Sequence, residues 1–124
     1  MDDRAGLGRA GEKRAERFLR RQRYRIVTRN YRCPAGEIDL VALDGRTVVF
    51  VEVKTRTDGQ YADPQDAVNP AKQRRLLKSA EFFLRQTDSQ ERPCRFDVIA
   101  ITLGGEAEMK VEHITDAFGP SGRR

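Results

Sequence analysis

The sequence predicts a mixed α/β fold, α+β by element order, in which a central mixed sheet is flanked by two helices. Two stretches, residues 4–22 and 70–86, combine helix-forming residues with an apolar period close to that of a helix. Runs of β-branched and aromatic residues predict about five strands, which gives the order α-β-β-β-α-β-β. With 124 residues, 38% of them apolar, we expect one domain over residues 1–118 and a flexible tail at 119–124.

Each helix is predicted by its own apolar stripe. The stripe of residues 4–22 consists of Leu7, Gly11, Ala15, Phe18, Leu19 and Gln22. The second helix is expected to start at Asn69-Pro70, because asparagine caps helices and proline suits the first helical position. It is expected to run to about Gln86 and to bury Leu76, Leu77, Ala80, Phe83 and Leu84.

The first three strands are predicted as a meander. Residues 24–31 are rich in β-branched and aromatic side chains, and the turn at residues 33–36 ends this strand. Residues 37–43 and 47–54 predict a hairpin joined at Asp44-Gly45, a strong short-range hairpin signal.

The remaining segments are a loop and two further strands. Residues 55–68 have no sustained period and are interpreted as a mobile loop. Residues 95–103 and 108–114 predict the last two strands, joined by a turn at Gly104-Gly105.

Charge alternates along the chain between basic and acidic segments. Residues 1–32 carry a net charge of +7 and residues 71–95 one of +4, whereas residues 33–70 and 96–124 carry −4 and −2. The basic segments would attract a polyanion, and the acidic stretch between them would hold a cation. The alternative interpretation, charged faces that only keep a small domain soluble, stays open.

Composition excludes several classes of protein. No stretch reaches the roughly 18 apolar residues that span a bilayer, and the N-terminus lacks an apolar signal region, so we expect a cytoplasmic protein without membrane contact. Cys33 and Cys94 are far apart, which argues against a disulfide framework or a thiolate metal site. Because His113 is the only histidine, we expect any metal to be held by oxygen ligands.

The predicted hairpin gathers acidic side chains on one face. Side chains alternate along a strand, so Glu37 shares a face with Asp39, and Glu52 shares a face with Lys54. A two-residue turn at Asp44-Gly45 sets Asp39 diagonal to Glu52, and a four-residue loop sets them directly opposite, whereas a three-residue loop sends them to opposite faces. In the first two arrangements Asp39 and Glu52 can share one cation.

Apolar residues alternate with these acids, so both strands are buried on at least one side, where an unpaired carboxylate costs several kcal/mol. A solvent-facing hairpin with Glu52 paired to Lys54 is the alternative, but it leaves three carboxylates repelling one another. On the first helix Glu12 is expected to reach toward the hairpin, while Glu16 lies further toward solvent. An exposed Glu12 is equally compatible with the sequence.

The motifs Gly36-Glu37-Ile38-Asp39-Leu40 and Phe50-Val51-Glu52-Val53-Lys54-Thr55-Arg56 resemble the PD-(D/E)xK nuclease signature. Over nearly its whole length the chain is similar to the YraN family of bacterial proteins, which resemble archaeal Holliday-junction resolvases. One departure is Arg23, where relatives often have glycine. The resemblance implies a restriction-endonuclease-like core and identifies Asp39 and Glu52 as magnesium ligands. It also implies that Lys54 is the signature lysine and that Glu12 is the acid of the first helix.

Together these features predict a Mg²⁺-dependent, endonuclease-like protein that acts on DNA phosphodiesters, branched DNA included, with Mn²⁺ as a substitute. Glu37 is either a further metal ligand or a hydrogen-bond acceptor that supports the ligands without touching the metal, and the two roles stay open. The predicted nucleic-acid contacts, whose alternative is a solvated face, are Arg56, Lys72, Arg74, Arg75 and Lys78. A nuclease fold that binds nucleic acid or a partner without turnover is the alternative function, and a homodimer is left open.

Overall fold

The computed structural model describes residues 4–57, 68–103 and 109–119. Two helices and five strands form the predicted order α-β-β-β-α-β-β, and the predicted α+β class is confirmed. The elements are α1 (Arg4–Arg21), β1 (Arg25–Cys33), β2 (Gly36–Asp44), β3 (Thr47–Thr57), α2 (Pro70–Gln86), β4 (Cys94–Leu103) and β5 (Lys110–Phe118). The predicted turn at Gly104-Gly105 and residues 120–124 of the predicted tail lie outside the described residues.

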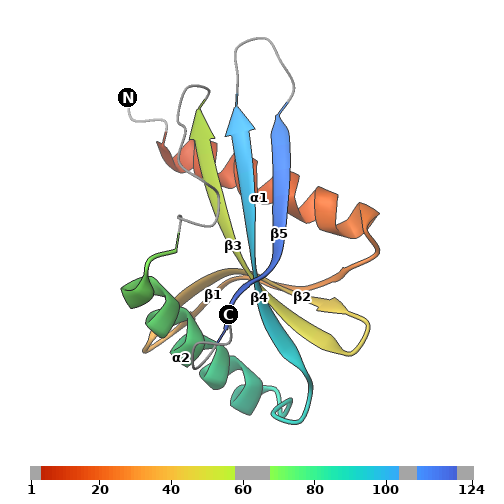
Figure 1. The fold of residues 1–124 in the computed structure, drawn as a ribbon, viewed down its shortest axis with the longest axis vertical. Coiled ribbons are helices and arrows are strands. Elements are labelled where there is room, and N and C mark those ends of the chain that lie inside the picture. Colours follow the sequence, from red (N-terminus) through yellow and green to blue (C-terminus); the bar gives the residue numbers. More distant parts are fainter. Residues whose placement is uncertain (1–3, 58–67, 104–108, 120–124) are drawn as a thin grey trace.

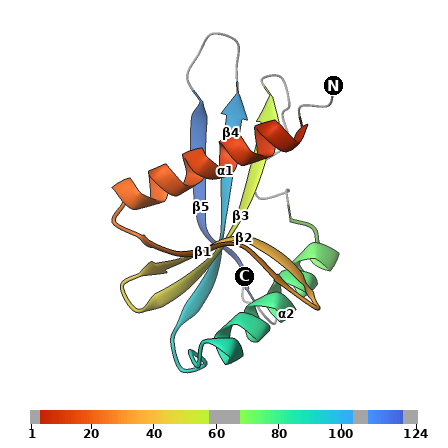
Figure 2. The ribbon, with the colours of Figure 1, turned by 180° about the vertical axis from the view of Figure 1, so that it is seen from behind.

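The five strands form one mixed sheet in the order β1-β2-β3-β4-β5. Strands β1 to β3 are an antiparallel meander, as predicted, and β4 then pairs parallel to β3 while β5 pairs antiparallel to β4. A parallel pair needs a crossover connection, which here contains α2. Figures 1 and 2 show α1 and α2 on opposite faces of the sheet.

The two faces of the sheet bury separate apolar layers. Toward α2, Phe50 stacks on Phe96 with ring centroids 5.3 Å apart and meets Phe83 edge-on. Toward α1, Val49 and Val51 pack with Ala15, Leu19, Leu40, Ile99 and Ile101. Alternation along β3 therefore produces both layers, since successive side chains point to opposite faces.

Helix α1 lies close to β3 because of one glycine. A Cβ atom added to Gly11 would overlap Oγ1 of Thr55 and lie 3.2 Å from its Cβ. The predicted stripe is buried at Gly11, Ala15 and Leu19, but Gln22 is exposed because the helix ends at Arg21. Glycine at position 11 is thus what brings the neighbouring Glu12 close to the sheet.

The turn after α1 contains Arg23, the position at which the family resemblance leads us to expect glycine. Arg23 has a φ of 71°, in the left-handed region that favours glycine. Its N–H still bonds the carbonyl of Arg20, and the chain enters β1 at Arg25. Arginine therefore occupies a backbone conformation that glycine adopts more readily.

Helix α2 begins and ends where the sequence predicts. Oδ1 of Asn69 accepts a hydrogen bond from the N–H of Lys72 at 2.9 Å, and Pro70 occupies the first turn. The helix buries Leu76, Ala80 and Phe83 together with Ser79, which the apolar pattern missed, while Leu77 and Leu84 are half-buried.

Several predicted boundaries are corrected. Strand β3 continues through Thr57, so residues 55–57 are strand rather than loop, and only residue 68 of the remaining predicted loop is described. Strand β1 runs to Cys33, and β5 runs to Phe118, four residues beyond the predicted end. Parallel pairing with β4 up to Thr57↔Leu103 gives β3 the partners that extend it.

The hairpin turn is also corrected. Asp44 pairs with Thr47, so the two turn residues are Gly45 and Arg46 rather than Asp44 and Gly45. Gly45 has a φ of 62°, a conformation that hairpin turns give to glycine. The resulting pairing of Leu43 with Val48 is that of the four-residue-loop alternative.

A buried charged cluster ties β4 to β5. The fully buried carboxylate of Asp97 accepts hydrogen bonds from Nε of Arg95 at 3.0 Å and from the N–H of Asp116 at 2.9 Å, and it contacts Nε2 of His113 at 2.7 Å. Arg95 also binds the hydroxyl of Tyr24, between α1 and β1. Burial opposes ionisation of Asp97, but these partners outweigh it and lower the pKa of its carboxyl.

Two further sequence expectations concern the cysteines and the membrane. Neither Cys33 nor Cys94 forms a disulfide within the described residues, and both are half-buried. Neither of the helices in the described part of the chain is long and apolar enough to cross a membrane.

Candidate metal and phosphate site

The candidate site lies where β2 and β3 part. The paired register ends at Leu40↔Val51, and its continuation by one residue sets Asp39 opposite Glu52. There the carboxylate of Asp39 accepts the N–H of Val53 at 2.8 Å, in the place of a main-chain acceptor. Asp39 thus closes the opening in the sheet, and its side chain is held in place by backbone.

Glu52 is buried opposite Asp39, with its side chain only 10% exposed. Its Oε2 forms an ion pair with Nζ of Lys72 in the first turn of α2. The cap at Asn69 and the proline after it fix this turn, and the start of the helix therefore holds the ammonium group of Lys72 next to Glu52. The structure therefore places Lys72 at the acidic pair.

The electrostatics of Asp39 follow from this crowding. Burial, together with the charge of Glu52 and more weakly that of Glu12, raises the pKa of Asp39 to about 7. The hydrogen bond from Val53 and the charge of Lys72 oppose the rise but do not cancel it. One lysine is therefore too little positive charge for this pair of acids.

Glu12 joins the site from α1, on the other face of the sheet. Burial and the charges of Glu37 and Glu52 raise its pKa, and the side chain of Asn30 opposes the rise. The predicted reach of Glu12 toward the hairpin agrees with these neighbours. Glu16 is not directed to solvent as expected, because it forms ion pairs with Arg29 on β1 at 2.6 Å and with Arg20 at 2.9 Å.

Glu37 and Lys54 lie at the outer edge of the site. Glu37 forms an ion pair with Arg32 at 3.0 Å and is largely exposed. Lys54 follows Glu52 by two residues on β3, is exposed, and has no hydrogen bond or ion pair within the described residues. The Glu52 to Lys54 pairing of the alternative interpretation is absent there, since Glu52 binds Lys72 instead.

The other predicted nucleic-acid contacts lie apart from this site. Arg56 is only 10% exposed and binds Glu112 and Thr102. Arg74 and Lys78 are exposed on α2 and line a cavity with Phe96 and Phe118. Arg75 is exposed on the same helix.

The donor chemistry of the site fits a small divalent cation. Asp39 uses one oxygen for Val53 and Glu52 one for Lys72, and the second oxygen of each forms no hydrogen bond or ion pair within the described ranges. Magnesium is typically bound by one or two carboxylates, with water and phosphate oxygens completing its shell. No group of three or more His, Cys, Asp or Glu side chains that could hold a metal exists within these ranges. The pair alone would therefore be the protein's contribution.

The sequence patterns did not predict the ion pair of Lys72 with Glu52 or the interaction of Asn30 with Glu12. Lys72 lies at the edge of the apolar stripe in the first turn of α2, which is a signal that it faces the sheet. Asn30 has a φ of 49°, which asparagine tolerates better than most residues, but nothing local links it to Glu12.

Comparison with known proteins identifies the family. The profile described as "Uncharacterised protein family UPF0102" matches residues 11–101. The chain is 51% identical over 112 residues to a UPF0102 protein of Geobacter metallireducens, covering 90% of this chain and 91% of that protein. It is 51% identical to a UPF0102 protein of Geobacter sulfurreducens, with 90% and 88% covered, and 46% identical to one of Symbiobacterium thermophilum, with 90% and 95% covered. The chain belongs to the UPF0102 (YraN) family, as its motifs indicated.

Proposed function

We propose that the protein is a Mg²⁺-dependent nuclease that hydrolyses DNA phosphodiesters in the cytoplasm. The observation that carries the proposal is the mutually repelling pair of half-buried Asp39 and buried Glu52 at the opening between β2 and β3. Two like charges are expensive to hold together unless a cation is bound, so such a pair is better explained by a ligand than by stability.

The residues around the pair have separate roles in this proposal. Asp39 and Glu52 would hold the cation, which when bound lowers the pKa of a water and polarises the phosphate. Lys54, exposed beside them, would meet negative charge that develops on the phosphate. Glu12 and Glu37 would accept hydrogen bonds from water at the rim of the site.

The cations of α2 would attract the substrate without reading its sequence. Lys72 would neutralise Glu52 until a cation binds and would then be available to a phosphate oxygen. Arg74, Arg75 and Lys78 would add long-range attraction from a second side of the helix. Arg56 would support β3 through Glu112 and Thr102.

A second candidate is a nucleic-acid-binding module without turnover. It is favoured by the ion pair between Lys72 and Glu52, because one ammonium group and one proton on Asp39 make the pair neutral without a metal. In this case Lys54 is one more surface cation, and its exact position has no special effect.

Metal binding is the first test. Calorimetry with Mn²⁺ compares wild type with Asp39→Asn and Glu52→Gln, each of which removes one charge and keeps the shape of the side chain. We expect both substitutions to abolish binding. Unchanged affinity in both variants would refute this site.

Turnover is the second test, with branched, single-stranded and duplex DNA in Mg²⁺, Mn²⁺ or EDTA. Lys54→Ala should lower the cleavage rate on the order of 10²- to 10³-fold while affinity measured in Ca²⁺ changes little, because the lysine acts in the transition state. Lys110→Ala removes an equal charge from an exposed position at the start of β5 and serves as the control. No cleavage by wild type above identically purified Glu52→Gln would leave only the binding module.

A further inference from the structure

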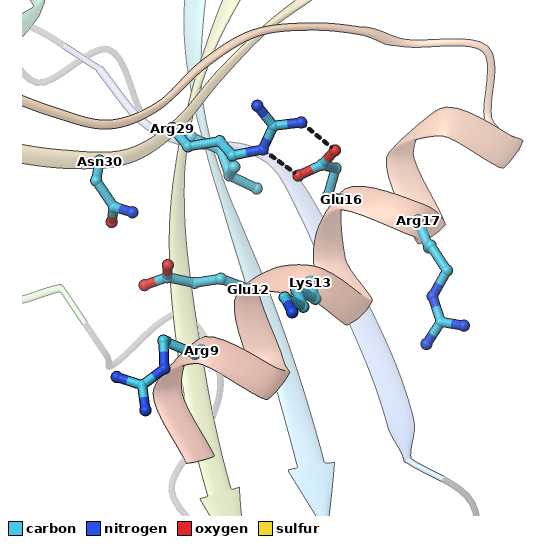
Figure 3. A pocket seen from close by; sticks show the side chains of 8 residues that line it. Arg9, Glu12, Lys13, Glu16, Arg17, Arg29 and Asn30 are labelled. Atoms are coloured by element: carbon cyan, nitrogen blue, oxygen red, sulfur yellow. Dashed lines mark hydrogen bonds and ion pairs between the residues drawn. The ribbon is translucent and has the colours of Figure 1, made fainter. Parts of the chain in front are cut away.

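A cavity of about 540 Å³ lies between α1 and β1, next to Glu12. Figure 3 shows Glu12 extending from α1 toward Asn30 on β1, with Arg9 beside it and Arg29 reaching from β1 to Glu16. Four cations line the cavity, and two carboxylates accompany them.

The carboxylate of Glu16 does not offset the free cations of this cavity. Arg29 donates to it through Nε and Nη2, both at 2.6 Å, and Arg20 adds a further ion pair. These contacts lower the pKa of Glu16 to about 2, so it stays ionised and fully engaged. The charge of Glu16 is thus already matched by Arg29 and Arg20.

Three cations of α1 have no such partner in the part of the chain that the structure describes. Arg9, Lys13 and Arg17 are exposed, and none has a hydrogen bond or ion pair within residues 4–57, 68–103 and 109–119. They follow one another at four-residue spacing, so they form one stripe with about 6 Å of axial rise per step. A regularly spaced row of unmatched cations fits a regularly spaced row of anions.

The stripe ends at the candidate site. Glu12 both lines the cavity and is close enough to Glu37 and Glu52 for their charges to raise its pKa. Cavities of 300–1,000 Å³ receive ligands of roughly drug size, so this one encloses about one or two nucleotides of a single strand at a time. A strand lying here would lead its phosphates toward Asp39 and Glu52.

We propose that the cavity between α1 and β1 is the path of one DNA strand, whose phosphates are bound by the stripe Arg9, Lys13 and Arg17. The inference rests on the proposed function, because it takes the parting of β2 and β3 as the end of the path. The ligand in this proposal is a single strand, and α1 is its principal contact. The cations of α2 contribute less to the affinity.

The test compares two triple variants that each remove three positive charges. Arg9→Gln/Lys13→Gln/Arg17→Gln removes the stripe, and Arg74→Gln/Arg75→Gln/Lys78→Gln removes the exposed cations of α2. Affinity for a labelled oligothymidine is measured in Ca²⁺ by fluorescence anisotropy over a range of salt concentrations, and thermal melting checks that both variants are folded. The probe requires no cleavage, so the result is independent of turnover.

Each phosphate contact on a single strand contributes about 0.7 to the slope of log affinity against log salt. Loss of the stripe should therefore lower the slope by about 2 and the affinity at low salt by more than tenfold. Loss of the α2 cations should change the slope by less than about 0.7, the value for one phosphate contact. An α1 variant no weaker than the α2 variant, or a wild type that does not bind the strand, overturns the inference. Absence of cleavage with stripe-dependent binding refutes only the nuclease proposal.

Discussion

The repulsion at the acidic pair has a measurable cost in stability. Asp39 has an ordinary pKa of 3.8 and a pKa of about 7 in the folded protein. Because the folded state binds the proton more tightly, the carboxyl contributes stability in acid that is lost as the pH rises from about 4 through 7. At 1.36 kcal/mol per pH unit, the loss amounts to about 4 kcal/mol at most.

Asp39→Asn should recover this loss. Asparagine keeps an oxygen that accepts the N–H of Val53, so the opening between β2 and β3 stays closed while the charge is removed. We expect Asp39→Asn to raise the free energy of unfolding by several kcal/mol at about pH 8 and by almost nothing at about pH 4. Urea denaturation across this range measures the difference.

Two controls make the measurement specific. Glu81→Gln neutralises an exposed carboxylate on α2 and should change stability by no more than about 0.5 kcal/mol at either pH. Added Mg²⁺ should stabilise wild type at the higher pH and not Asp39→Asn, since only wild type keeps both acids. A destabilised Asp39→Asn at pH 8, or a difference that does not vary with pH, would show that the pair is not strained.

The remaining predictions concern the core and helix α1. Asp97→Asn should destabilise the protein by about 1.5–3 kcal/mol at neutral pH, because Arg95 and the N–H of Asp116 lose a charged acceptor in the core while Arg95 keeps its ion pair with Asp44. Because folding lowers the pKa of Asp97, the stability lost in Asp97→Asn should shrink as the solution is made acidic. This pH dependence is opposite to that expected for Asp39→Asn, and the same urea series tests it. Gly11→Ala should lower the free energy of unfolding by about 1–3 kcal/mol, because the added Cβ overlaps Thr55. Gly8→Ala should instead stabilise the helix by about 0.5–1 kcal/mol, because nothing lies within 4 Å of the added Cβ. Equal melting temperatures for the two variants would contradict the close packing of α1 on β3.

Local sequence signals were sufficient for the elements but not for the register of the hairpin. Both Asp44-Gly45 and Gly45-Arg46 satisfy the requirement for glycine in a tight turn, and only pairing across the sheet selects the second. The face shared by Asp39 and Glu52 was predictable in either case, since their alternation with apolar residues leaves the acids together on one side. Which of the two alternatives holds decides whether the acids are diagonal or opposite.

Contacts between distant segments lie beyond such signals. The edge of the apolar stripe indicates that Lys72 faces the sheet, but its pairing with Glu52 depends on where the crossover places the start of α2. The cavity beside α1 depends likewise on β1, where the register shifts between Ile26 and Thr28 and leaves Val27 44% exposed. Sequence patterns specify faces of elements, whereas these contacts follow from how the elements pack.

The parting of β2 and β3 brings the fold and the candidate chemistry together. Where main-chain pairing stops, the N–H of Val53 needs another acceptor, and Asp39 supplies it. The same opening lets Glu12 approach from the face of α1 and Lys72 from the face of α2, although the sheet separates the two helices elsewhere. Since Asp39 has both a structural and an electrostatic role, only a substitution that keeps its acceptor, such as asparagine, can separate the loss of charge from damage to the sheet.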